Sequence, residues 1–249
     1  MTNQDLVERA LEIIQAGDEK GVCLRLLGGL AVRIASPSTC SQAYLQREYA
    51  DIDFAGLGRD RWKIKDLFLE LGYVPDDRFN ALHGRTRLIF YPPDGGSHVD
   101  IFLDRFQMCH ILDLRQRLFA DYRTLALADL LVTKLQVVQM NAKDLMDILA
   151  ILLDHGVQSG EAREVIDLAY LASLVSTDWG LYTTMSDNLR RTRDEFSGIL
   201  EPLQRETVSN RIDAILRAMD TAPKTVAWKL RAKVGRRMEW FELPDEVNR

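Results

Sequence analysis

Hydrophobic positions in the first 125 residues follow helical and strand spacings in turn. Over 2–16 the apolar residues recur at helical spacing, with Thr2 and Asp5 placed to form a capping box and Gly17 placed to stop the helix. Over 59–71 they again fall on one helical stripe. Short apolar or alternating runs predict four strands, at 22–27, 50–54, 86–91 and 98–103. This half of the chain therefore combines helices with a sheet.

The segments between these elements have turn or loop character. Residues 92–96, Pro-Pro-Asp-Gly-Gly, are turn formers, so the strands on either side are predicted to form an antiparallel hairpin over 86–103. Residues 36–48 are polar and are predicted to form a loop or a flap. A strand followed by a loop is predicted over 73–80, and a short strand or an irregular turn near 112–119.

From residue 126 onward the apolar spacing is helical. One helix passes through Leu127 and Val138, and Asn141 with Asp144 is a good N-cap pair for the next, which Gly156 ends. Further helices are predicted at 161–175, at about 179–199 and at about 205–220. The class predicted is therefore α+β: a domain over 1–125 with a mixed or antiparallel sheet flanked by helices, then an all-helical domain over 126–249 packed on it.

Composition places the chain among ordinary globular proteins. Of its 249 residues 47% are hydrophobic and 28% charged, and the chain is long enough for a sizeable core. Its three cysteines lack CxxC spacing, which fits reduced thiols and a cytoplasmic location. No apolar run approaches the ~20 residues of a membrane span, and the polar N-terminus has no signal-peptide pattern, so no membrane partner is expected.

Charge is distributed unevenly. The net charge of -5 argues against wholesale coating of nucleic acid. The segment 224–237, however, is basic and has no acidic residue; its cations are Lys224, Lys229, Arg231, Lys233, Arg236 and Arg237. This segment points to a nucleic-acid acceptor such as RNA, bound through phosphates. The apolar residues between the cations equally fit an amphipathic helix with one packed face, or a solvated face.

The pair Asp51 and Asp53 is the strongest chemical signal. Residues two apart on a strand share a face, so both carboxylates point the same way. Asp100 lies on the 98–103 strand, on the face that it shares with His98. If the two strands are neighbours, three like charges converge, and a cation between them is required; a divalent metal with oxygen ligands is the obvious candidate.

Gly28 and Gly29 lie at a strand-to-helix junction, ahead of a helical turn over 30–35. Backbone N–H groups at such a junction can hold a phosphate, and the missing side chains allow close approach. A glycine pair can also be no more than a turn.

Taken together, these residues resemble the DNA polymerase beta-like nucleotidyltransferase superfamily. The resemblance covers about residues 20–155. Within the superfamily, this segment is similar to the nucleotidyltransferases of the AbiEii abortive-infection toxin type and their bacterial relatives. The motifs that carry it are, in order, Leu26-Leu27-Gly28-Gly29, Asp51-Ile52-Asp53, His98-Val99-Asp100, Lys134 and Lys143-Asp144-Leu145-Met146-Asp147.

The resemblance implies a site and an activity. It implies that Asp51 and Asp53 hold Mg²⁺, two ions in all, and that Asp100 is a third ligand and the general base. It implies that Gly28 and Gly29 contact the β- and γ-phosphates of an NTP. The implied reaction transfers a nucleotidyl group from the NTP to a hydroxyl of RNA, protein or a small molecule. A toxin-like member would also have an antitoxin partner.

Two departures from the family pattern are visible. Leu30 stands where many members have Ser or Thr after the glycines, which weakens the expected grip on the triphosphate. Asp51 follows Gly29 by 22 residues, about twice the gap in compact members, and the extra length is the predicted flap.

Several side chains have two possible roles. Lys134 is predicted to contact the triphosphate in catalysis, but it also fits a pair with an aspartate or an exposed lysine on an apolar helix. Asp147 is either a nucleotide-site residue or the salt-bridge partner of Lys134 or Lys143. Three arginines are further candidates for contact with phosphate or acceptor: Arg47, Arg85 and Arg87.

Two other functions fit the same sequence. The chain could be a nucleotide-binding or regulatory module with weak catalysis, which the missing hydroxyl after Gly29 favours. It could also be a structural protein whose aspartates serve salt bridges only.

Overall fold

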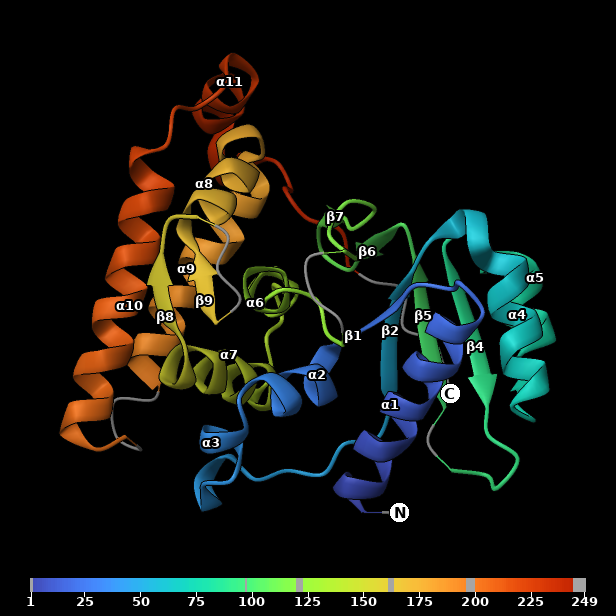
Figure 1. Ribbon diagram of the computed structural model, residues 1–249. Helices are drawn as coiled ribbons and strands as arrows, with labels where there is room; N and C mark the ends of the chain where they lie inside the picture. The colour runs from blue at the N-terminus through green and yellow to red at the C-terminus, as the bar shows by residue number, and fades with distance from the viewer. Residues whose placement is uncertain (1, 97, 120–122, 161–163, 196–199, 244–249) are drawn as a thin grey trace. The chain divides into compact units, whose positions relative to one another are not determined.

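The computed structural model describes residues 2–96, 98–119, 123–160, 164–195 and 200–243 (Figure 1). The chain forms two compact units. The first consists of Met1–Ala35, Gln46–Phe106 and Leu112–Ala126, and the second of Ser36–Leu45, Gln107–Ile111 and Leu127–Arg249.

The first unit is built on a five-stranded mixed sheet. Its strands, in spatial order, are β1 (Leu24–Leu27), β2 (Ile52–Gly56), β5 (Val99–Leu103), β4 (Arg87–Tyr91) and β3 (Val74–Pro75). Strands β2 and β5 are parallel, and the other neighbours are antiparallel. The predicted hairpin is therefore present as β4 and β5.

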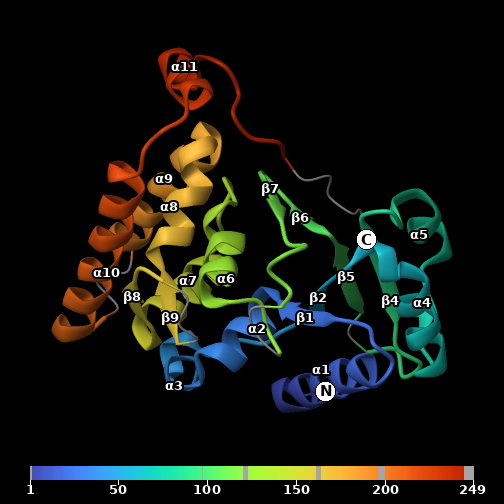
Figure 2. The ribbon, with the colours of Figure 1, turned by 45° about the horizontal axis from the view of Figure 1, so that its top comes forward.

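One face of this sheet is apolar and carries the core of the unit. Helices α1 (Asn3–Glu19) and α4 (Arg61–Glu70) pack against it: Ile64 lies beside Gly56 of β2, and the ring of Phe68 stacks on Phe90 with centroids 4.5 Å apart. Figures 1 and 2 show both helices beside the sheet. The strand residues on this face are Leu24, Leu26, Ile52, Phe54, Leu88, Phe90, Val99 and Ile101, and all are buried.

The first helix has the predicted start but not the predicted end. The backbone N–H of Asp5 donates to Thr2 Oγ1 at 3.2 Å, and that of Thr2 donates to Asp5 Oδ2 at 2.6 Å, which completes the capping box. The helix continues through Gly17 to Glu19, so the predicted stop is wrong. A Cβ at Gly17 would lie 2.9 Å from the carbonyl oxygen of Val22, so this glycine makes room for the returning chain.

Two predicted loops contain helices. After β3 the chain forms α5 (Asp77–His83), where a loop was predicted; Asp76 caps it by accepting from the N–H of Phe79 at 2.9 Å. The predicted flap contains the short helix α3 (Pro37–Cys40) and a 3₁₀ turn over Ala43–Leu45.

The second unit is mainly helical. Its helices are α6 (Leu127–Leu135), α7 (Ala142–Asp154), α8 (Leu168–Thr177), α9 (Trp179–Glu195), α10 (Pro202–Thr221) and α11 (Val226–Val234). The capping box of Asn141 and Asp144 at the start of α7 is present as predicted. The class α+β, with a mixed sheet and a helical C-terminal part, is confirmed.

Short strands interrupt the helical half. The chain forms β8 (Gly156–Gln158) and β9 (Val165–Asp167), a parallel pair, where the helix predicted at 161–175 should begin. That helix starts only at Leu168, capped by Asp167, and residues 161–163 lie outside the described residues. Before the helical half, a further two-stranded sheet is formed by β6 (Arg105–Gln107) and β7 (Ile111–Asp113). The last part of the helix predicted at 179–199 also lies outside the described residues.

The apolar side of the basic segment is packed only in part. In α11, Val226 and Leu230 are 74% and 58% exposed, while Trp228 packs edge-on against Tyr182. Arg236 is paired with Asp187 at 2.7 Å. No helix in the described part of the chain is long and apolar enough to cross a membrane.

Candidate active site

The glycine pair lies at the predicted strand-to-helix junction. Strand β1 ends at Leu27, and α2 (Gly28–Ala35) begins at once. Gly28 has φ +73°, a left-handed conformation that costs glycine little and other residues more. A Cβ at this position would overlap Oδ2 of Asp53. Glycine therefore lets the Asp53 carboxylate lie directly against the backbone of the junction.

Asp53 and Asp100 are direct partners across parallel strands β2 and β5. Partners on neighbouring strands share a face, so both carboxylates lie on the face opposite the apolar core. Asp51 immediately precedes β2 and, two residues from Asp53, is placed on the same side. Asp100 is only 2% exposed. The strand register therefore puts Asp53 and Asp100 side by side, as the sequence predicted for neighbouring strands.

A guanidinium lies among these carboxylates. Arg87 Nε donates to Asp100 Oδ1 at 2.7 Å, and its Nη2 donates to Asp100 Oδ2. Burial alone would lower the pKa of Arg87, but the hydrogen bonds and charge of Asp100 outweigh it, and the charges of Asp53 and Asp51 add to them. The pKa of Arg87 is therefore raised. The cation that the acidic cluster requires is, in this structure, Arg87.

His98 provides a second contact to the cluster. Its Nδ1 lies 2.9 Å from Oδ1 of Asp51, and its side chain is 12% exposed. His98 precedes β5 by one residue, so it lies beside Asp51, which precedes β2 by one residue. The alternation of side chains along the strand predicted that His98 shares a face with Asp100. The structure shows that its partner there is Asp51.

Arg47 is the residue whose position the sequence did not reveal. A Cβ at Gly29 would overlap its guanidinium, so the second glycine accommodates an arginine at the first turn of α2. The guanidinium carbon lies 4.3 Å above the ring of Tyr49. Asn3 holds the segment that carries Arg47 in place: its Nδ2 donates to the carbonyl oxygen of Arg47 at 2.7 Å, and its Oδ1 accepts from Tyr49 N at 3.2 Å. The only sequence signal was a cation four residues before Asp51.

Lys134 and Asp147 form an ion pair in the second unit. Lys134 Nζ lies 2.9 Å from Asp147 Oδ2 and 3.2 Å from Asp144 Oδ1. The Asp147 side chain is 3% exposed and that of Lys134 14%. Of the two roles open to Asp147 from the sequence, the salt bridge is the one that the structure contains.

The acidic cluster has the oxygen ligands of a magnesium site, but in this structure the Arg87 guanidinium occupies those of Asp100. Carboxylate oxygens are the ligands that Mg²⁺ takes, and Asp51 and Asp53 reach the same face as Asp100. Both oxygens of Asp100 accept from Arg87. Among the residues that the structure describes, no three His, Cys, Asp or Glu side chains are grouped so as to hold a metal. The donor set fits the ion if Arg87 yields its place at Asp100.

No protein-family model and no curated protein matches the chain. Among solved structures, the lincosamide antibiotic adenylyltransferase LnuA, lincomycin-bound, has a TM-score of 0.43 and 17% identity, covering 58% of this chain and 95% of its own. The antibiotic-resistance factor ANT(2'')-Ia has a TM-score of 0.35 and 13% identity, covering 94% and 97%. An antigenic nucleotidyltransferase-like protein from Paracoccidioides brasiliensis has a TM-score of 0.41 and 11% identity, covering 91% and 97%. TM-scores below 0.5 at such identities leave the function to be argued from this chain's own residues.

Proposed function

We propose that this protein is a Mg²⁺-dependent nucleotidyltransferase that moves a nucleotidyl group from an NTP to an acceptor hydroxyl. The observation that carries the proposal is the in-register pair Asp53 and Asp100, with Gly28 open to the Asp53 carboxylate. Like charges on neighbouring strands repel, so the acidic face favours a bound cation in addition to Arg87, which bonds to Asp100.

The reaction has simple requirements. The acceptor oxygen forms a bond to the α-phosphorus, the bond from that phosphorus to the bridging oxygen breaks, and pyrophosphate leaves. Magnesium held by Asp51 and Asp53 would supply positive charge to the phosphates. The hydroxyl proton needs an acceptor, and Asp100, on the adjoining strand, is the carboxylate in place for it once Arg87 releases one of its oxygens.

The triphosphate is assigned to the first turn of α2. Backbone N–H groups at a helix N-terminus attract phosphate, and Gly28 and Gly29 add no side chains of their own at this one. The guanidinium of Arg47 lies against Gly29 and provides charge-assisted donors there. Arg47 would thereby take over the phosphate contact that a hydroxyl at Leu30 does not provide. Lys134, held by Asp144 and Asp147, is kept as a further candidate for the phosphates.

The test is binding and turnover with each NTP. Thermal unfolding is measured with and without Mg²⁺ for the wild type, for Asp51→Ala/Asp53→Ala, and for the control Glu12→Ala/Asp66→Ala, which removes two exposed carboxylates elsewhere. A ligand at about 100 times its Kd stabilises the folded state by about 2.7 kcal/mol. We expect a Mg²⁺-dependent shift with at least one NTP, retained in the control and lost in the aspartate variant. No shift with any NTP would overturn the proposal.

One observation favours a second function, a nucleotide-binding module with weak catalysis. Arg87 engages both oxygens of Asp100, which leaves the general base blocked unless the pair opens. Pyrophosphate release in the presence of NTP, Mg²⁺ and a panel of hydroxyl acceptors separates the two. Binding without release identifies the module, whereas release that Asp100→Asn abolishes identifies the transferase.

A further inference from the structure

A hollow of about 400 Å³ lies in the first unit between α4, α5 and the start of β4. Leu88 forms part of its wall, and Leu88 belongs to the apolar face of the sheet. The hollow is therefore on the opposite side of the sheet from Asp53 and Asp100. It is separate from the proposed active site.

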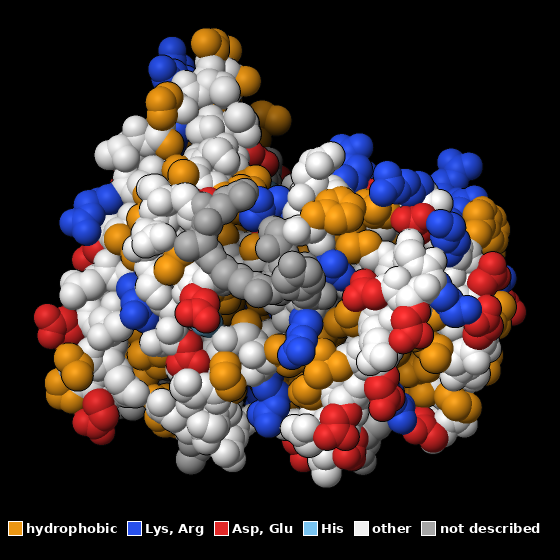
Figure 3. Space-filling model, viewed as in Figure 1, with side chains coloured by type: hydrophobic (Ala, Val, Ile, Leu, Met, Phe, Trp, Pro, Cys, Tyr) orange, Lys and Arg blue, Asp and Glu red, His pale blue; other side chains and the backbone are white. Residues whose placement is uncertain are grey.

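Three cations line this hollow: Arg61, Lys65 and Arg85. Arg61 and Lys65 are four residues apart on α4, so they lie on one side of the helix. None of the three forms an ion pair with another described residue, whereas their neighbours Arg59 and Lys63 both lie 3.7 Å from Asp60. Lys and Arg side chains also gather at the upper right of the face drawn in Figure 3. The hollow therefore carries a net positive charge, because Asp77 is the one acidic residue among the described residues that line it.

An exposed aromatic ring adjoins the cations. Trp62 also lines the hollow and is 62% exposed. The guanidinium of Arg61 lies 4.6 Å from its ring centroid. Exposing so much of a tryptophan to water is unfavourable, and a planar group that stacks on it would cover that surface. Asn80 also lines the hollow, and its side chain is held in place by hydrogen bonds to both backbone groups of Ile89.

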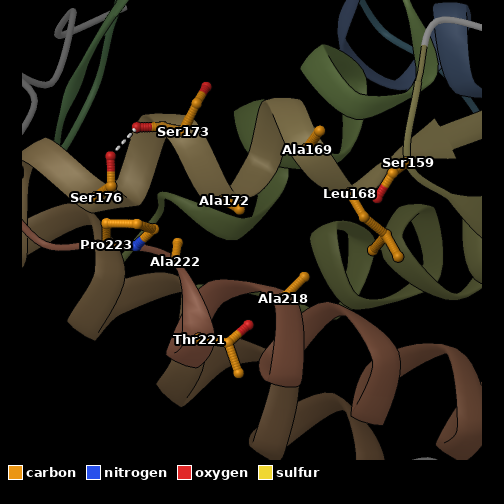
Figure 4. A pocket seen from close by; sticks show the side chains of 10 residues that line it. All are labelled: Ser159, Leu168, Ala169, Ala172, Ser173, Ser176, Ala218, Thr221, Ala222 and Pro223. Atoms are coloured by element: carbon orange, nitrogen blue, oxygen red, sulfur yellow. Dashed lines mark hydrogen bonds between the residues drawn. The ribbon is translucent and has the colours of Figure 1, made fainter.

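A hollow in the second unit shows a different chemistry. It measures about 620 Å³ and lies between α8 and the end of α10, where Figure 4 shows small side chains such as Ala172, Ser173 and Ala218. Ser176 Oγ donates to the carbonyl oxygen of Ser173 at 2.7 Å. Among the described residues that line it, none is charged. Of these two hollows, the one in the first unit combines charged side chains with an exposed aromatic ring.

We propose that the hollow between α4 and α5 binds a nucleotide unit. Its phosphate contacts Arg61, Lys65 and Arg85, and its base stacks on Trp62. Guanidinium groups match phosphate oxygens in charge and geometry, and a tryptophan face accepts any base. The unit is either a free mononucleotide or part of a single-stranded nucleic acid. The proposal does not depend on nucleotidyl transfer, because the aspartates lie on the other face of the sheet.

The experiment measures binding of a fluorescein-labelled single-stranded RNA of about 12 nucleotides by anisotropy, in EDTA and over a range of salt. Arg61→Gln/Lys65→Gln should weaken binding at least about tenfold and reduce the steepness of log K against log salt by about 0.7 for each phosphate that is no longer neutralised. Trp62→Ala should weaken binding about fivefold or more and leave the slope unchanged. The control Arg59→Gln/Lys63→Gln removes the same charge from the same segment and should change neither quantity.

Competition identifies the source of the nucleotide. Displacement by millimolar AMP as effective as by unlabelled RNA supports a free mononucleotide, and affinity that rises with RNA length supports a nucleic acid. Loss of binding in the control as large as in Arg61→Gln/Lys65→Gln would overturn the proposal, because the attraction would then be general surface charge. The proposal would also be overturned if neither RNA nor AMP bound, or if polyglutamate displaced the labelled RNA while AMP and unlabelled RNA did not.

Discussion

The carboxylate of Asp53 occupies the space in which the side chain of any residue other than glycine at position 28 would begin. Gly28 also has φ +73°, so the position is closed to other residues by space and by backbone conformation together. This contact joins the strand-to-helix junction to the acidic cluster. Asp53 and Gly28 therefore lie in direct contact, as the proposed site requires.

Replacing Gly28 by alanine should therefore destabilise the protein by more than its backbone conformation explains. The left-handed conformation accounts for about 1 kcal/mol of the loss in unfolding free energy, and the displaced Asp53 adds to it. Gly95→Ala is the matched control, because Gly95 has φ +69° and no atom of a described residue beyond its chain neighbours lies within 4 Å of the position of a Cβ. Urea unfolding measures both. Equal losses would show that the contact with Asp53 contributes nothing.

Arg87→Met should leave Asp100 buried without its guanidinium partner. Breaking a buried ion pair in this way costs about 3 kcal/mol of unfolding free energy or more, and the Asp100 side chain is 2% exposed. If Asp100 belongs to a metal site, added Mg²⁺ should stabilise this variant more than the wild type. Arg9→Met, whose partner Asp94 is 52% exposed, is the control and should lose about 1 kcal/mol or less. A loss at Arg87 no larger than at Arg9 would contradict the buried pair.

His110 should make the protein less stable in mild acid. The side chain is 7% exposed and its Nε2 lies 2.9 Å from Thr184 Oγ1, and burial lowers its pKa. In the unfolded chain a histidine takes up its proton near pH 6.5, so between that pH and the lowered folded pKa the unfolded state binds more protons. The unfolding free energy should therefore fall as the pH is lowered through 6.5.

His110→Gln tests this dependence. Unfolding free energies of the variant and the wild type, measured by urea between about pH 7.5 and 5, should converge as the pH falls, because the variant lacks the titrating group. The same substitution at exposed His83 controls for the loss of an imidazole elsewhere. Parallel curves for His110→Gln and wild type would contradict the prediction.

Local signals in the sequence predicted local structure well. Both capping boxes, at Thr2 and at Asn141, are present because each involves groups within three residues of one another. The carboxylates on one face followed from the two-residue period of a strand, and the β4–β5 hairpin from the turn residues between them. The sequence also predicted a cation among the aspartates, with a divalent metal as the candidate, and the structure has the Arg87 guanidinium at Asp100. That the cation is Arg87 depends on the pairing of β4 with β5, which places it beside Asp100.

What the sequence did not reveal depends on contacts between distant residues. Gly17 has the character of a helix stop, but its role is to admit the carbonyl of Val22. The helix α5 is supported by Asn80, whose side chain bonds to both backbone groups of Ile89 on the next strand. The position of Arg47 over Gly29 requires the long segment before it to return to the junction. No spacing along the chain encodes these approaches.

Lys134→Met separates a structural from a phosphate-binding role for this lysine. The substitution retains the aliphatic stem and leaves Asp147, whose side chain is 3% exposed, without its 2.9 Å partner, so about 3 kcal/mol of unfolding free energy should be lost. Lys143→Met, on the same helix as Asp147 but with an exposed side chain, should be nearly neutral. The double variant Lys134→Met/Asp147→Leu should recover most of the loss, because an apolar pair of similar volume can replace a buried ion pair. Thermal shifts with NTP and Mg²⁺ are then measured in that stable double variant. A retained shift assigns Lys134 to the stability of the helix pair, and a lost shift in a folded protein assigns it to the nucleotide.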